Sequence, residues 1–191
     1  MKTVVDVLYE EYETFNKFFK EQNEISFQVA IENHLKKNLL LSAASYFEVL
    51  IIEALVNFFD ECSNSNHIIN SFLKNKALKR QYHTLFKWDE KNGYTTFFGL
   101  LGEKFKAYMN TNMKANKKLS KSIAAFMSIG DERNRLVHLN YGTYTLEKTI
   151  GEIYSLYNDA SYFVNGLPDF LRLQEIPEDT DETNITDISA V

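Results

Sequence analysis

The sequence is poor in the residues that make turns and covalent cross-links: it has seven Gly, two Pro and one Cys among 191 residues. Sheet-rich folds need many tight turns, so this scarcity favours long helices joined by short connections. Cys62 has no second cysteine to pair with, which excludes an internal disulfide and favours a cytoplasmic protein.

Targeting signals are also lacking. The first residues, MKTVVDVLYEEYE, turn acidic by Asp6 without an apolar run, so we expect no signal peptide. The most apolar window, 39–59, is long enough to span a bilayer but carries Glu48 and Glu53 near its middle. Because an acid in mid-membrane costs about 2.5 kcal/mol or more, a buried helix explains the window better, and we expect no membrane partner.

The acidity of the chain is concentrated near its C-terminal end. The net charge is −5, yet from Glu175 onward there are six acids and no Lys or Arg, which leaves 21 basic and 20 acidic residues before that point. The near-neutral remainder does not exclude a nucleic-acid partner. We expect one helical domain over 1–172 and an acidic, disordered tail over 173–191, which either solubilises the protein or competes with RNA.

Apolar residues, 45% of the chain, recur at helical spacing and nowhere alternate for long enough to predict a strand. The periodicity predicts six helical segments: 3–21, 26–60, 67–87, 97–108, 116–139 and 145–167. Gly142 is expected to cap the fifth helix, and Pro168 to end the last. The predicted fold class is all-α, a bundle of four or more long helices with 39–59 at its centre.

The stretch GDERNRLVH, residues 130–138, breaks an apolar ladder. Upstream, one face of the helix is marked by Leu119, Ile123, Phe126 and Met127. At about 100° per residue the same face continues with Arg133 and Asn134, and His138 lies at its edge. Burying such groups costs several kcal/mol unless they are paired. One turn therefore departs from the core pattern, as functional sites often do.

Arg133, Asn134 and His138, at the end of a helix in an all-α chain, resemble the signature of the HEPN superfamily, most closely its RiboL-PSP-HEPN branch. The segment SAASYFE, 42–48, is similar to that branch's small-then-aromatic-then-acid segment, and the order of elements fits over 28–166. The resemblance implies a two-fold homodimer that cleaves RNA, without metal or cofactor, where two motif helices meet. It implies Arg133 and His138 as the catalytic pair, positioned by Asn134.

These residue types suit RNA cleavage to a 2′,3′-cyclic phosphate and a 5′-hydroxyl. A base must take the 2′-OH proton, an acid must protonate the leaving 5′ oxygen, and positive charge must stabilise the phosphorane. His titrates near neutral pH, and Arg presents a charged fork to phosphate. Arg133 and His138 lie about 140° apart around the helix, and one His does not readily serve as both acid and base. Two facing motif helices would supply the missing groups.

Other residues are assigned supporting parts. Glu48, an acid in an otherwise apolar helix, needs a partner if it is buried, and Arg133 also points inward, so Glu48 is the candidate that holds the guanidinium in place; spacing does not establish this contact. Asn134 and His138 are four residues apart on one helix, where a contact between them is natural. Weaker candidates for binding RNA precede the motif in a basic segment: Lys114, Lys117, Lys118 and Lys121. The structural alternatives are an Arg–Glu pair that joins helices, a helix-end His and a solvated lysine face.

Three other histidines, His34, His67 and His83, lack metal-ligand spacing, so zinc is not expected, and Cys62 is interpreted as a packing residue. We predict a cytoplasmic endoribonuclease, a toxin or antiphage-defence effector whose partners are RNA, a second copy and a cognate antitoxin or other defence protein. The alternative is a non-catalytic HEPN-like dimer that binds RNA, nucleotide or a partner protein. No recognition helix favours a transcriptional regulator.

Overall fold

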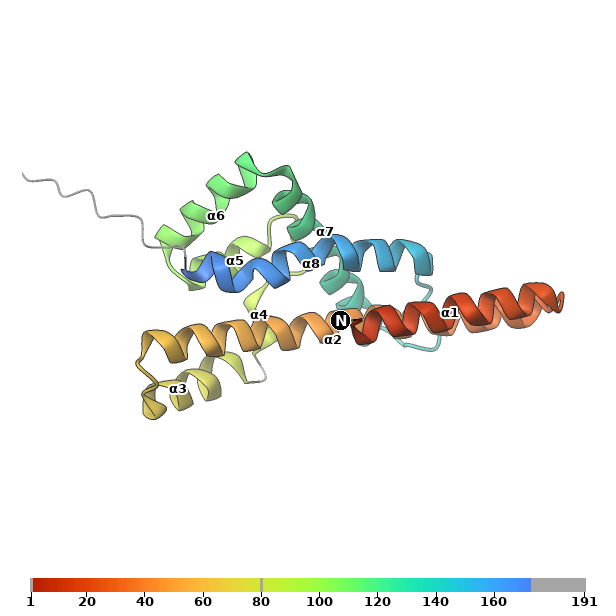
Figure 1. Ribbon diagram of the computed structural model, residues 1–191, viewed down its shortest axis with the longest axis horizontal. Coiled ribbons are helices and arrows are strands. Elements are labelled where there is room, and N and C mark those ends of the chain that lie inside the picture. The colour runs from red at the N-terminus through yellow and green to blue at the C-terminus, as the bar shows by residue number, and fades with distance from the viewer. Residues whose placement is uncertain (1, 80, 173–191) are drawn as a thin grey trace, which may run out of the picture.

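The computed structural model describes residues 2–79 and 81–172, which are built of helices without strands (Figure 1). In chain order the elements are α1 (Val4–Glu21), α2 (Ile25–Cys62), α3 (His67–Leu73), the π-helical turn η1 (Lys74–Leu78), α4 (Tyr82–Leu85), α5 (Tyr94–Leu100), α6 (Glu103–Ala115), α7 (Lys117–His138) and α8 (Ile150–Arg172). The predicted all-α bundle is confirmed. The tail expected to be disordered, 173–191, lies outside the described residues.

The bundle is organised around α2, whose 38 residues extend for about 57 Å. α1 lies alongside the N-terminal part of α2, while α8 packs against both α2 and α7 (Figure 1). Where these three helices meet, the ring of Phe126 in α7 lies 6.0 Å from that of Phe47 in α2 and 5.4 Å from that of Phe163 in α8. All three rings are buried. This aromatic contact holds α7, the helix that contains the stretch 130–138, in the core.

α2 is, among the described residues, the one helix long and apolar enough to cross a membrane by length and composition. Its apolar face is used inside the bundle, where Leu40, Phe47 and Ile51 are at most 1% exposed. Of its two central acids, Glu53 is exposed and Glu48 is half-buried. This packing fits the prediction of a core helix.

Two expected helices are broken. The segment 67–87 is divided among α3, η1 and α4, and this turning directs Tyr82 and Leu85 into the core. The segment 97–108 is divided between α5 and α6, because Gly102 adopts a φ of +100°, a conformation that interrupts a helix and favours glycine. The long periodic segments survive as single helices.

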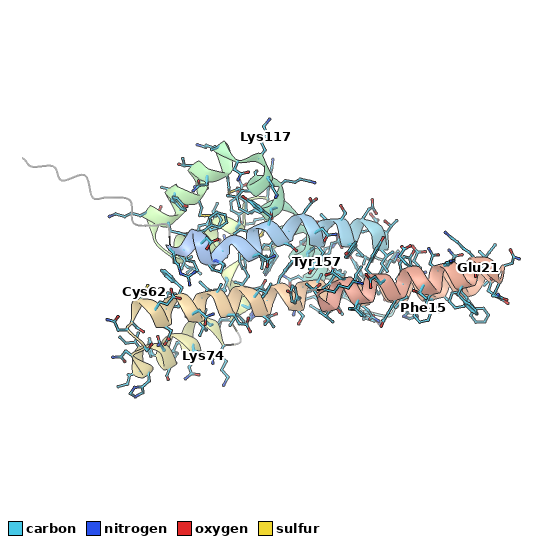
Figure 2. The ribbon with its side chains drawn as sticks, in the orientation of Figure 1. Phe15, Glu21, Cys62, Lys74, Lys117 and Tyr157 are labelled. Carbon is cyan, nitrogen blue, oxygen red and sulfur yellow. The ribbon has the colours of Figure 1, made fainter. Side chains whose placement is uncertain are left out.

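Helix ends differ from the predictions as well. α7 ends at His138 with Leu139 in an extended conformation, so Gly142 is not its cap. α8 begins later than expected, at Ile150. Thr149, directly before it, and Glu152 in its first turn form a capping box, in which the side chain of each accepts a hydrogen bond from the backbone N–H of the other. It also continues through Pro168 to Arg172. Cys62, at the end of α2, is exposed and does not pack in the core (Figure 2).

Ser122 joins α7 to α8 through a buried hydroxyl group. Its Oγ donates a hydrogen bond to the carbonyl oxygen of Ala160 at 3.1 Å and accepts one from the backbone N–H of Phe163 at 2.8 Å. The residue is 1% exposed. Ala160 and Phe163 are themselves fully buried, so the hydroxyl group makes two hydrogen bonds between the helices inside the core.

We expect Ser122→Ala to lower the free energy of unfolding by about 1–3 kcal/mol, because it removes two buried hydrogen bonds that each contribute about 0.5–1.5 kcal/mol. Urea denaturation measures the change. Ser161→Ala is the matched control, because the Ser161 hydroxyl bonds only the Tyr157 carbonyl of its own helix and should change stability by no more than about 0.5 kcal/mol. Equal losses in the two variants would contradict the bridging role.

Candidate functional site

The last turns of α7 divide their side chains between the core and a surface hollow. Ile129, Glu132 and Leu136 are buried and continue the core-facing side of the helix. Arg133 and Asn134 are half-buried beside it. The interpretation that these two polar residues continue the core stripe is therefore corrected: the buried side drifts around the helix, which frees them to face a hollow.

A hollow of about 340 Å³ opens beside this turn, and we call it the motif groove. Three helices contribute its lining residues, namely Glu48 from α2, Tyr82 and His83 from α4, and Arg133, Asn134 and His138 from α7. The groove thus brings together, in one chain, the four residues predicted as catalytic or supporting. It adds two that the sequence did not indicate. A wider hollow of about 620 Å³ shares His83, Asn134 and His138 and continues past Asp89 and Arg135.

The guanidinium of Arg133 is held along its own helix. Its Nη1 donates a hydrogen bond to Oδ1 of Asn134 at 3.2 Å. Within the described residues no ion pair joins Glu48 to Arg133 and no hydrogen bond joins Asn134 to His138, so both expected contacts are wrong. Helical spacing gives the direction in which a side chain leaves α7, but it does not determine where long side chains end.

Charges in and beside the groove affect two nearby pKa values. Burial raises the pKa of Tyr82, the Glu48 carboxylate raises it further, and Arg133 opposes them. Tyr82 therefore stays neutral and is not an acid or base near pH 7. Burial also raises the pKa of Asp131, with Glu132 and Asp89 adding to the effect and Arg135 opposing it. In the described part of the chain no three His, Cys, Asp or Glu side chains are grouped to hold a metal ion.

Glu132 fixes the loop that follows the motif helix. Its carboxylate accepts hydrogen bonds from the hydroxyl of Tyr144 and from Nζ of Lys148, each at 3.0 Å. The same loop reaches α2, where Nζ of Lys37 donates to the carbonyl oxygen of Tyr141 at 2.6 Å. Because the loop begins directly after His138, these contacts hold the end of α7 in place. An acid at a core-facing position is the one sign of this role that can be read from the sequence.

Trp88 holds α4 against α7. Its indole ring lies on the backbone of Gly130, and a Cβ at that glycine would overlap the six-membered ring. Its indole N–H donates to the carbonyl oxygen of His83 at 3.1 Å. The ring is 8% exposed and also lies 5.5 Å from that of Phe126. Gly130 and Trp88 together therefore place His83 at the groove. The one Trp of the chain is the sequence feature that could have indicated this contact.

The basic segment lies at the opposite end of α7. Lys117 is at the outer corner where α6 meets α7 (Figure 2), about 24 Å along the helix from Arg133. Lys121 pairs with Asp159 at 2.8 Å, and Nζ of Lys118 lies 4.3 Å from the centre of the Tyr162 ring. The structure does not bring these lysines, or Lys114 on α6, into the motif groove. Their contact with RNA stays a prediction about a separate surface.

The fold and the groove together describe a HEPN-type protein, an all-helical bundle whose motif helix ends in Arg-Asn and a His beside a polar hollow. A family model described as RiboL-PSP-HEPN matches residues 6–172. The chain belongs to the RiboL-PSP-HEPN family. The match extends further in both directions than the 28–166 inferred from the sequence. A search of curated proteins and a search of solved structures each gave no match.

We expect Gly130→Ala to lower the free energy of unfolding by about 1–3 kcal/mol, because the new methyl group must displace the Trp88 ring. Thermal and urea denaturation measure the loss. The control is Gly151→Ala on α8, where an added Cβ meets no atom within 4 Å and alanine should stabilise by up to about 1 kcal/mol. Unchanged stability of Gly130→Ala would show that the packing of the Trp88 ring against α7 does not require a glycine at this position.

Proposed function

We propose that this protein is a metal-independent endoribonuclease that cleaves RNA by attack of the 2′-hydroxyl. The observation that carries the proposal is the motif groove, in which Arg133, Asn134 and His138 of α7 share one hollow with Glu48 of α2. HEPN domains are commonly ribonucleases, and membership of the family supports the same activity. A volume of about 340 Å³ is within the range of small-ligand sites and suits one nucleotide.

Four of the groove residues have a part in this chemistry. His138 exchanges a proton with a reacting oxygen, and Arg133 stabilises the negative charge that develops on the phosphorane. Asn134 positions the Arg133 guanidinium through the hydrogen bond between them. Glu48 faces the cation from α2 and limits its movement electrostatically, without the direct contact of an ion pair.

The wider proposal concerns assembly and biology. The protein acts as a homodimer in which two motif helices face each other across a two-fold axis, in the cytoplasm, as a toxin or antiphage-defence effector. A cognate antitoxin or another defence protein would restrain it. These statements rest on membership of the family.

We expect His138→Ala and Arg133→Ala each to lower the rate of RNA cleavage by about 10²- to 10⁴-fold, because each removes a group that acts on the transition state. Cleavage of a labelled RNA in the presence of EDTA measures the rates, and product analysis should find 2′,3′-cyclic phosphate ends. His67→Ala is the control, since His67 is exposed on α3 and does not line the groove.

Two results would contradict the proposal. One is an absence of cleavage by the wild type across varied single-stranded and structured RNAs. The other is equal cleavage by the wild type and by folded His138→Ala and Arg133→Ala variants.

The second candidate function is a non-catalytic dimer that binds RNA, a nucleotide or a partner protein. The position of Glu48 favours the last of these, a partner protein, because a carboxylate in the same hollow as Arg133 opposes the approach of a phosphate group. Groove-dependent binding of RNA or nucleotide without cleavage, lost in Arg133→Ala, would select this function.

A further inference from the structure

We infer that His83 is a second proton-transfer residue of the cleavage reaction, acting with His138 of the same chain. The inference rests on the proposed ribonuclease activity and deepens it. Its basis is a juxtaposition: His83 from α4 and His138 from α7, 55 positions apart in the sequence, line both hollows beside the motif. Asn134 also lines both, while Arg133 lines the smaller one. The two imidazoles therefore border the same space as the cation.

The backbone of His83 is held on both sides. Tyr82, directly before it, is buried, and its ring lies 5.8 Å from that of Trp88. The indole N–H of Trp88 donates to the carbonyl oxygen of His83 itself, and the indole ring rests on Gly130 of α7. The His83 side chain is nevertheless exposed. A histidine on a fixed backbone with an accessible ring beside a groove is suited to proton transfer and has no structural role in the core.

The reaction needs two proton-transfer groups. A neutral imidazole takes the 2′-hydroxyl proton while the bond from the 2′ oxygen to phosphorus forms. An imidazolium gives its proton to the 5′ oxygen while the bond from phosphorus to that oxygen breaks. The products are a 2′,3′-cyclic phosphate and a 5′-hydroxyl, and no atom is oxidised or reduced. Proton transfer through solvent afterwards returns each histidine to its starting state.

His83 removes the argument that a second subunit must supply the missing group. Arg133 and His138 lie about 140° apart around α7, yet both line the motif groove, because α2 and α4 enclose that side of the helix. With His83, one chain provides two imidazoles and a guanidinium. In a dimer, each copy would then carry a complete set.

The first test compares steady-state cleavage by His83→Ala, His138→Ala, the control His67→Ala and the wild type. We expect His83→Ala to lower kcat by about 10²- to 10⁴-fold, with RNA affinity and thermal stability close to wild type. Affinity is measured with RNA carrying 2′-O-methyl groups, which cannot react. A rise in KM at unchanged kcat would assign His83 to binding and overturn the inference.

The second test uses RNA in which sulfur replaces the bridging 5′ oxygen at one linkage. A thiolate leaves without being protonated, so loss of the general acid no longer slows the reaction, whereas loss of the base still does. We expect one of His83→Ala and His138→Ala, and not the other, to return to within about tenfold of the wild-type rate on this substrate. The rescued variant identifies the acid. Rescue of neither variant would overturn the acid–base pair.

The third test co-expresses His83→Ala and His138→Ala subunits. If the two histidines act within one chain, every groove in the mixture lacks one of them and activity stays low. Recovery to a substantial fraction of wild type would mean that the histidines act across subunits and would overturn the inference. The outcomes also separate the two proposals: a wild type that cleaves no RNA ends both. Equal cleavage by the wild type and His83→Ala, with His138→Ala inactive, ends only this one.

Discussion

Trp88 packs against the backbone of α7 at Gly130, and this contact determines where the rest of the candidate site can be. The ring fills the space that any side chain at Gly130 would occupy. Through its hydrogen bond to the carbonyl oxygen of His83, it fixes α4 at the same level of the helix. α4 can therefore form one side of the groove because Gly130 of α7 has no side chain.

The motif stretch 130–138 serves two purposes that alternate along one helix. Gly130 and Glu132 are structural: the first accepts an aromatic ring, and the second holds the following loop through Tyr144 and Lys148. Arg133 and His138 face the groove. This division explains how a helix end can carry polar groups that face a groove and still be held in place, because its buried residues are tied to α4 and to the loop.

Sequence periodicity predicted the long helices well, because an apolar face is a local property of 15–40 consecutive residues. It failed at α4, whose conformation depends on contacts with Gly130, more than 40 positions away.

Placing Glu48 near the motif was correct, because an acid in an apolar helix must face a polar space. The Arg133–Glu48 contact was wrong, because spacing gives a direction on the helix but not the end point of a flexible side chain. The proximity of His83 to His138 could not be predicted from the sequence, because the two residues lie 55 positions apart on different helices.

A groove lined by three helices of one chain also changes what a two-fold dimer would do for catalysis. If one chain supplied only His138 and Arg133, pairing would be needed to complete the acid–base set. With His83 in the same groove, pairing would instead place two complete sets side by side. The electrostatic consequence is direct: the Glu48 carboxylate and the Arg133 guanidinium line the same groove, so a single groove attracts phosphate weakly. Two grooves brought together would present two Arg133 guanidinium groups along an RNA strand, and dimerisation would then act mainly on substrate binding.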